Sequence, residues 1–93
     1  MSELINSLSA IIAERKANPS PGSYTAQLMG AGTGKIAQKV GEEAVEVVVA
    51  ALEESDERLI SEMADLIYHS LVLLEQRGLS WLDVEAELAS RFK

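Results

Sequence analysis

The stretch KIAQKVGEEAVEVVVAALE, residues 35–53, decides the fold class of this chain. It contains no proline, and Gly41 is its one strong helix-weakening residue. The run of Val47, Val48 and Val49 favours a β-strand by propensity. A strand, however, is typically about 5–6 residues long, and this stretch continues far beyond that between helix-forming flanks. We therefore predict one long helix here.

The N-terminal segment also carries helix signals. Residues 3–17 place apolar side chains at helical spacing, and Ser2 is the expected N-cap. These apolar residues are Leu4, Ile5, Leu8, Ile11 and Ile12. The turn-forming sequence NPSPGS, residues 18–23, ends this helix. A short second helix is expected over residues 23–29.

The C-terminal half predicts two more helices. Ser55 or Asp56 begins a long helix, and Gly78 is the expected residue just past its end. Residues 80–83 have the spacing of a capping box, which would open a last helix that runs to Phe92. No strand-like alternation is present. We predict that residues 1–93 form a single all-α domain of four main helices plus one short helix.

Composition and charge limit the class of protein. The formal net charge of −7 disfavours binding to nucleic acid or to an anionic membrane. Cysteine is absent, which excludes disulfides and thiolate metal sites. The longest apolar run, Val47 to Leu52, is too short to cross a membrane, and the start MSELINSLSA lacks the basic region of a signal peptide. We expect a soluble cytoplasmic protein.

Residues 30–35, GAGTGK, look like a phosphate-binding loop. A Walker A loop needs a glycine five residues before the Gly-Lys pair and a Ser or Thr after it. Met29 and Ile36 occupy those two positions. We interpret GAGTG as a connection between helices, with Thr33 as an N-cap. Lys35 and the amides of a helix N-terminus stay candidates for contact with an anion.

Five charged side chains of the long helix fall on one stripe. A helix turns by about 100° per residue, so these groups share a sector about a quarter-turn wide. They are Lys35, Lys39, Glu42, Glu43 and Glu46.

A second acidic pair lies on the next helix. Glu62 and Asp65 are three positions apart, and His69 follows one turn later on the same face. Helices joined by a short connection pack antiparallel, which brings residues 43–46 level with residues 62–65. We predict that four carboxylates face one another.

Facing carboxylates repel each other unless a cation lies among them. Mg²⁺ and Mn²⁺ prefer oxygen ligands, and such an ion also lets an acidic protein bind a phosphate ester. Lys35 and Lys39 would then contact the outer phosphates. From spacing alone, a solvated acidic face is the alternative, because ExxE and ExxD occur on many helices.

Three blocks of the chain resemble phosphoribosyl-ATP pyrophosphatases, and together they cover nearly its whole length. They are ERKANPSPGSYTAQL (14–28), KIAQKVGEEAVEVVVAA (35–51) and EMADLIYHSLVLLEQRGLSWLDVEAEL (62–88). The wider superfamily of all-α nucleoside triphosphate pyrophosphohydrolases is marked by EExxE followed by ExxD. These motifs correspond here to residues 42–46 and 62–65.

The resemblance implies an activity and a set of metal ligands. The reaction is Mg²⁺-dependent hydrolysis of the α–β phosphoanhydride of phosphoribosyl-ATP, which gives phosphoribosyl-AMP and pyrophosphate in the second step of histidine biosynthesis. The implied metal ligands are Glu43, Glu46, Glu62 and Asp65, with Mn²⁺ as an alternative ion. Glu42 is expected to orient or deprotonate the attacking water. A structural contact with a neighbouring lysine or backbone group is the alternative role for Glu42.

Other residues have both a functional and a structural interpretation. His69 is expected to brace Asp65 from behind the metal shell, and contact with the substrate is the alternative. Ser23 and Tyr24 lie in a block that matches the family, so we expect substrate contact, although a helix cap explains Ser23 equally well. Trp81 is expected to pack against a neighbouring helix.

The long helix at residues 35–53 is apolar around most of its circumference after Glu43. In a small chain this pattern suggests a subunit interface, and the resemblance implies dimeric relatives. We therefore expect a homodimer whose two chains complete a helical bundle. The residues are Val45, Val47, Val48, Val49, Ala51 and Leu52.

Two other functions remain open from the sequence. One is a house-cleaning pyrophosphatase that acts on non-standard nucleoside triphosphates. The other is a non-enzymatic helical dimerisation module, which would leave the facing carboxylates unexplained. The blocks KVGEEAVE and SYTAQL favour the histidine-pathway activity over the first alternative.

Overall fold

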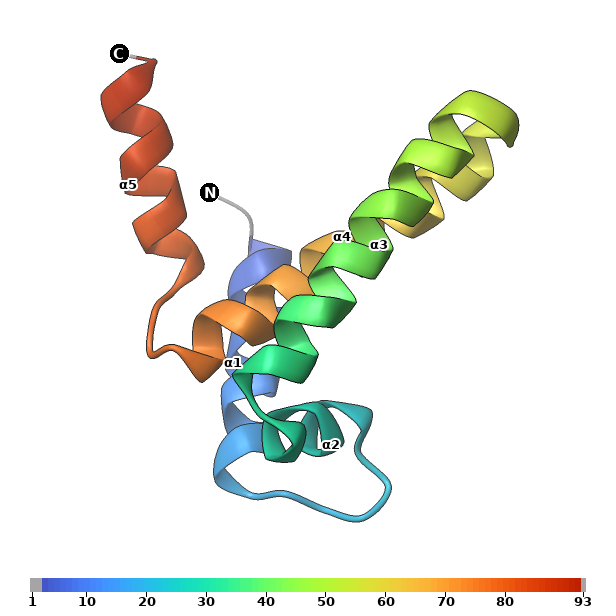
Figure 1. Ribbon diagram of the computed structural model, residues 1–93. Helices are drawn as coiled ribbons and strands as arrows, with labels where there is room; N and C mark the ends of the chain where they lie inside the picture. Colours follow the sequence, from blue (N-terminus) through green and yellow to red (C-terminus); the bar gives the residue numbers. More distant parts are fainter. Residues whose placement is uncertain (1–2, 93) are drawn as a thin grey trace.

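The computed structural model describes residues 3–92, and over that range it consists of five α-helices without a strand (Figure 1). The helices are α1 (Glu3–Ala17), α2 (Tyr24–Ala31), α3 (Thr33–Glu53), α4 (Asp56–Gln76) and α5 (Trp81–Arg91). The prediction of an all-α fold is confirmed. None of the helices in this range is both long and apolar enough to cross a membrane.

The long helices α3 and α4 form an antiparallel hairpin that dominates the molecule (Figure 1). The side chain of Ser55 caps α4, because its hydroxyl oxygen accepts a hydrogen bond from the backbone N–H of Arg58 at 3.2 Å. One half of the hairpin packs against α1 and α2, and the half that contains the turn projects away from them (Figure 1). We call these the inner half and the outer half of the hairpin.

The apolar core lies in the inner half. Each of the first four helices contributes at least one buried side chain to it, and Trp81 at the start of α5 packs against it as expected. The buried members are Ile12, Leu28, Ile36, Leu71 and Val72. This core fixes the distance between α3 and α4 next to the acidic residues.

The GAGTG segment differs from the expected loop. Gly30 lies in α2 and Gly34 lies in α3, so Gly32 alone connects the two helices. Gly32 has a φ of 95°, a conformation that favours glycine, whereas the other glycines adopt helical backbone here. Thr33 is the first residue of α3 rather than its N-cap, which is Gly32. The three closely spaced glycines suggested a longer loop, but only Gly32 interrupts the helical backbone.

The other helix ends agree closely with the sequence. The Ser23 hydroxyl caps α2, which ends two residues later than expected. Gly78, with a φ of 72°, follows α4. The carboxylate of Asp83 accepts the backbone N–H of Ser80 at 2.9 Å, and α5 ends one residue before Phe92. The expected cap at Ser2 lies outside the described residues.

Candidate active site

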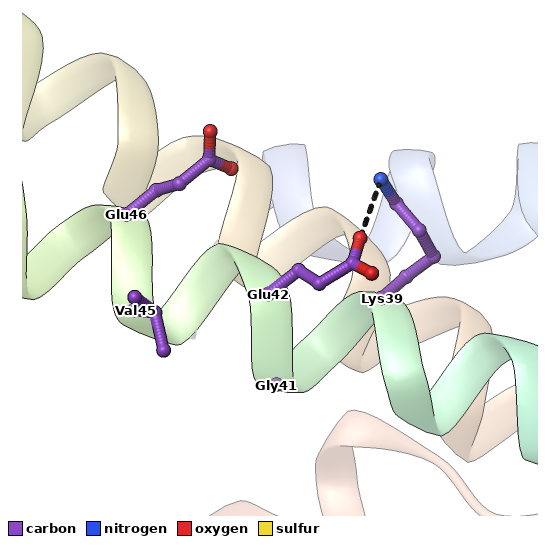
Figure 2. Close-up of a pocket in the computed structure, with 5 residues that line it drawn as sticks. All are labelled: Lys39, Gly41, Glu42, Val45 and Glu46. Atoms are coloured by element: carbon purple, nitrogen blue, oxygen red, sulfur yellow. Dashed lines mark ion pairs between the residues drawn. The ribbon is translucent and has the colours of Figure 1, made fainter.

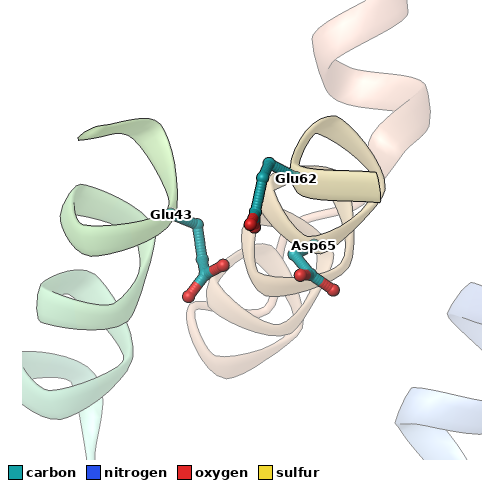
Figure 3. A group of neighbouring side chains, drawn as sticks. All are labelled: Glu43, Glu62 and Asp65. Carbon is teal, nitrogen blue, oxygen red and sulfur yellow. The ribbon is translucent and has the colours of Figure 1, made fainter. Parts of the chain in front are cut away.

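Three carboxylates from two helices converge between α3 and α4 (Figure 3). Glu43 comes from α3, and Glu62 and Asp65 come from α4. One oxygen of each lies within 4.8 Å of those of the other two. Glu43 and Glu62 are each only 6% exposed. The predicted register of the two helices is therefore confirmed for these three residues, which we call the acidic triad.

The position of the triad follows from helix geometry and packing. Glu62 and Asp65 share a face of α4 because they are three residues apart. Antiparallel packing brings the opposing face of α3 with Glu43 to the same level (Figure 3). Burying carboxylates is unfavourable unless positive charge compensates them. Two cations compensate them here: Lys39 Nζ lies 3.6 Å from Glu43, and the guanidinium of Arg58 donates to Glu62.

Glu46 lies beside the triad rather than within it. Its side chain is exposed, and it shares an open surface depression of about 550 Å³ with Lys39 and Glu42 (Figure 2). The neighbouring Glu43 carboxylate raises the pKa of Glu46 by sharing a hydrogen bond and by repulsion. Burial, together with repulsion from Glu46, also raises the pKa of Glu62. Repulsion from Asp65 adds to both shifts, so Glu46 is electrostatically linked to the triad although it lies beside it.

Glu42 is exposed on α3 and contacts two neighbours on its own helix, of which Figure 2 shows Lys39. Its carboxylate accepts a hydrogen bond from the side-chain amide of Gln38 at 2.8 Å and forms an ion pair with Lys39 at 3.3 Å. Both contacts lower the pKa of Glu42, and the hydrogen bond from Gln38 has the larger effect. Attraction to Lys35 lowers it slightly further. The lysine contact considered for Glu42 from the sequence is therefore present.

Lys39 bridges Glu42 and the buried Glu43, and its side chain is 26% exposed. The hydrogen bond with Glu42 is the main reason that the pKa of Lys39 is raised. Lys35 lies one turn earlier on α3 and is exposed. Lys39 therefore contacts the triad through Glu43, whereas Lys35 interacts only weakly with Glu42.

His69 is buried on α4 and links the triad to α2. Its Nδ1 atom lies 2.7 Å from the backbone carbonyl oxygen of Asp65, and its Nε2 atom lies 2.9 Å from the hydroxyl of Tyr24. A carbonyl only accepts hydrogen bonds, so in the neutral ring Nδ1 carries the hydrogen and Nε2 accepts from the Tyr24 hydroxyl. His69 contacts the Asp65 backbone, and through Tyr24 it fixes α2 against this part of α4.

Tyr68, next to His69 on α4, escaped the sequence analysis. Tyr68 stacks on Tyr24 with 6.2 Å between ring centroids, and its hydroxyl is hydrogen-bonded to the side chain of Thr25. Tyr24 is 47% exposed, and partial burial raises its pKa. These pairs join positions more than 40 residues apart, so local spacing could not reveal them. Ser23, by contrast, is buried and uses its hydroxyl as the cap of α2.

Arg58 also escaped the sequence analysis, although a local signal was present. It lies four residues before Glu62 on α4, a spacing that allows an ion pair on one helix face. The centre of the site therefore contains only carboxylate oxygens, and the cationic side chains of Lys39 and Arg58 lie at its edges. Such an all-oxygen donor set fits Mg²⁺ or Mn²⁺.

Comparisons with known proteins point to one family. Residues 5–92 match the family model described as phosphoribosyl-ATP pyrophosphohydrolase. The chain is 55% identical to the phosphoribosyl-ATP pyrophosphatase of Metallosphaera sedula over 93 residues, all of both chains. It is 53% identical to that of Pyrobaculum aerophilum over 91 residues, 98% of this chain and 97% of the relative. It is also 48% identical over 89 residues to the histidine biosynthesis bifunctional protein of Oceanobacillus iheyensis, covering 96% of this chain and 41% of that protein.

Proposed function

We propose a function from one premise: the chain belongs to the phosphoribosyl-ATP pyrophosphohydrolase family. It is a hydrolase that converts phosphoribosyl-ATP to phosphoribosyl-AMP and pyrophosphate, the second step of histidine biosynthesis. The observation that carries this function to a site is the acidic triad, since two of its three carboxylates are buried and all three converge within 4.8 Å.

Our proposal places one or more Mg²⁺ ions, or Mn²⁺, at the acidic triad. Glu43, Glu62 and Asp65 would hold the metal, and the neighbouring Glu46 would supply a fourth carboxylate. Bound there, the metal would neutralise charge on the triphosphate and on the departing pyrophosphate. Support comes from the donor set, which contains only the carboxylate oxygens that such ions prefer.

The cationic and polar residues at the edge of the triad would hold the substrate. Lys39 and Lys35 would contact the phosphate oxygens of a substrate bound in the depression beside α3. Glu42 would orient the attacking water or accept its proton; its lowered pKa keeps it ionised, which favours orienting the water over accepting its proton. Tyr24, which lies close enough to Lys39 for the two side chains to influence each other's pKa, would contact the substrate with its exposed face. When the His69 ring is neutral, the Tyr24 hydroxyl donates its hydrogen bond to Nε2 of His69. The Tyr24 oxygen can then accept a hydrogen bond from a hydroxyl or water, but it cannot donate one to a phosphate.

We also propose that the protein is a cytoplasmic homodimer whose second copy covers the outer half of the hairpin. The support is the exposure of large apolar side chains there: Val45 (61%), Val48 (55%) and Leu52 (78%) on α3, and Ile60 (70%) on α4. Exposed apolar residues gathered on one part of a molecule are typical of an interface.

A direct assay tests this function. The protein is incubated with phosphoribosyl-ATP and, separately, with dUTP and dCTP, with Mg²⁺ or with a chelator, and pyrophosphate release is measured. We expect release from phosphoribosyl-ATP only when Mg²⁺ is present. Faster release from dUTP or dCTP would favour the house-cleaning activity instead. An absence of release from every nucleotide would favour the dimerisation module.

A further inference from the structure

The site contains one cation that the proposed reaction does not use, the guanidinium of Arg58. We propose that Arg58 is a placeholder for the metal ion: it holds Glu62 while the site is empty and transfers to Glu54 when the metal binds. Arg58 would thereby lower the affinity of the site for the metal. This inference rests on the proposed metal site at the acidic triad.

Arg58 has two carboxylate partners that lie on opposite sides of it in the sequence. Its Nη2 atom donates to Oε2 of Glu62, one turn later on α4. Its Nε atom lies 3.8 Å from Oε1 of Glu54, the C-cap residue of α3. Glu62 belongs to the acidic triad, whereas Glu54 does not. The guanidinium therefore already lies between a proposed metal ligand and a substitute partner.

Burial shows which partner can move. The side chain of Glu62 is 7% exposed, whereas that of Arg58 is 55% exposed and that of Glu54 is 40% exposed. Arg58 thus reaches the buried carboxylate from the solvent side. It can withdraw by rotating its own side chain, without opening the contact between α3 and α4. The pair with Glu54 joins two partly exposed side chains, so forming it more fully would change the free energy little.

Competition follows from the chemistry of the shared oxygen. The Oε2 atom that accepts from Arg58 belongs to a carboxylate that the metal would need. Two cations at one carboxylate repel each other strongly where solvent is scarce. Lys39 differs because it bridges Glu43 to Glu42 on the α3 side, where the phosphates are proposed to lie.

Arg58 therefore stabilises the empty site more than the filled one. Replacing it leaves three converging carboxylates with less compensation when no metal is present. The filled site loses little, because there the metal supplies the positive charge. By linkage, a change that raises the free energy of the empty state alone tightens binding of the metal.

The experiment measures binding of Mn²⁺ alone by calorimetry to Arg58→Gln and to the wild type. We expect the variant to bind about fivefold more tightly, the upper range for loss of a partly exposed ion pair. Arg91→Gln is the matched control, because Arg91 is also an exposed arginine paired four residues away, with Glu87 on α5. It removes the same charge far from the triad and should leave Mn²⁺ affinity unchanged.

Thermal unfolding gives a second readout that does not rely on calorimetry. Arg58→Gln should lower the melting temperature of the metal-free protein and leave that of the Mn²⁺-saturated protein at the wild-type value. Equal losses in both states would mean that Arg58 is a permanent part of the fold. Arg58→Met serves as a second neutral variant that keeps the aliphatic stem of the side chain, and the same pattern is expected.

A second pair of variants tests the substitute partner. Glu54→Gln should weaken Mn²⁺ binding more than Glu53→Gln, because only Glu54 receives the displaced guanidinium. Equal effects would overturn the transfer to Glu54. Unchanged or weaker binding in Arg58→Gln would overturn the placeholder role while leaving the metal site intact. Absence of Mn²⁺ binding to the wild type would overturn the metal site and this inference together.

Discussion

The two halves of the α3–α4 hairpin use the same helices for different purposes. In the inner half, Ile36 of α3 and Val72 of α4 are completely buried because α1 and α2 cover them. In the outer half, Val48, Leu52 and Ile60 are more than half exposed. Two helices alone can cover only the faces that they turn toward each other, so the remaining apolar faces of the outer half stay open.

The acidic triad lies where these two halves meet. Its residues are close to the packed core, which holds α3 and α4 at a fixed distance. They are also close to the outer half of the hairpin. The difference teaches that geometry at the site depends on the inner half, whereas the proposed dimer would depend on the outer half. The following changes act on one half, or on the boundary, in order of expected effect.

Val48→Glu is the largest expected change, because it places a charge in the proposed interface of the outer half. An unpaired charge buried between subunits should weaken the dimer roughly a thousandfold and leave each chain folded. Sedimentation equilibrium at micromolar concentration measures this shift, with circular dichroism as the check on folding. A wild-type protein that is already monomeric and fully active would refute the dimer.

Ile36→Ala attacks the inner half. Removing this completely buried side chain should lower the free energy of unfolding by about 2–4 kcal/mol, through lost burial and the cavity left behind. Val45→Ala is the comparison in the outer half, made in the monomeric Val48→Glu background, and should cost less than about 0.5 kcal/mol. Urea unfolding measures both; similar losses would show that the two halves are equally packed.

Glu43→Gln changes the boundary without changing side-chain size. Loss of one anionic metal ligand should reduce turnover at least about a hundredfold and abolish Mg²⁺ binding in calorimetry, while the fold survives. Glu46→Gln is expected to act in the same direction. Normal activity in Glu46→Gln would remove Glu46 from the proposed set of four ligands.

Lys39→Ala tests the substrate grip on the α3 side. We expect kcat/KM to fall about tenfold, the effect of losing one charged contact to phosphate. Lys16→Ala is the control, because Lys16 contacts the backbone carbonyl of Glu75 at 3.0 Å, away from the triad. If both variants lose activity equally, Lys39 is an ordinary surface charge.

The pH dependence of the metal-free protein gives the smallest expected effect. Glu43 raises the pKa of Glu46 above its ordinary value of 4.5, so the folded state binds this proton more tightly than the unfolded state. The contribution of Glu46 to stability is therefore present below pH 4.5 and is lost as the pH rises through the raised pKa. In chelator, the melting temperature of the wild type relative to Glu46→Gln should rise as the pH falls toward 4.5. A difference that is independent of pH would contradict this coupling.

Much of the molecule follows from local signals in the sequence. Helix periodicity and end signals predicted the helices because their hydrogen bonds and caps join residues a few positions apart. The register of the acidic triad was also predictable, since Glu62 and Asp65 share a helix face and a short turn leaves the antiparallel partner few alternatives. The error at GAGTG was local as well: composition does not reveal which glycine adopts a positive φ.

Tertiary structure alone decided the contacts between distant segments. Two hydrogen bonds, Tyr24 with His69 and Thr25 with Tyr68, depend on how α2 lies across α4. No spacing along the chain encodes that arrangement. The same is true of exposure, which distinguishes the buried Glu62 from the exposed side chain of Arg58. The sequence by itself determined which charges can share a helix face, because helix geometry is the same everywhere. Only packing determined which of them lose contact with water, because that depends on what covers each face.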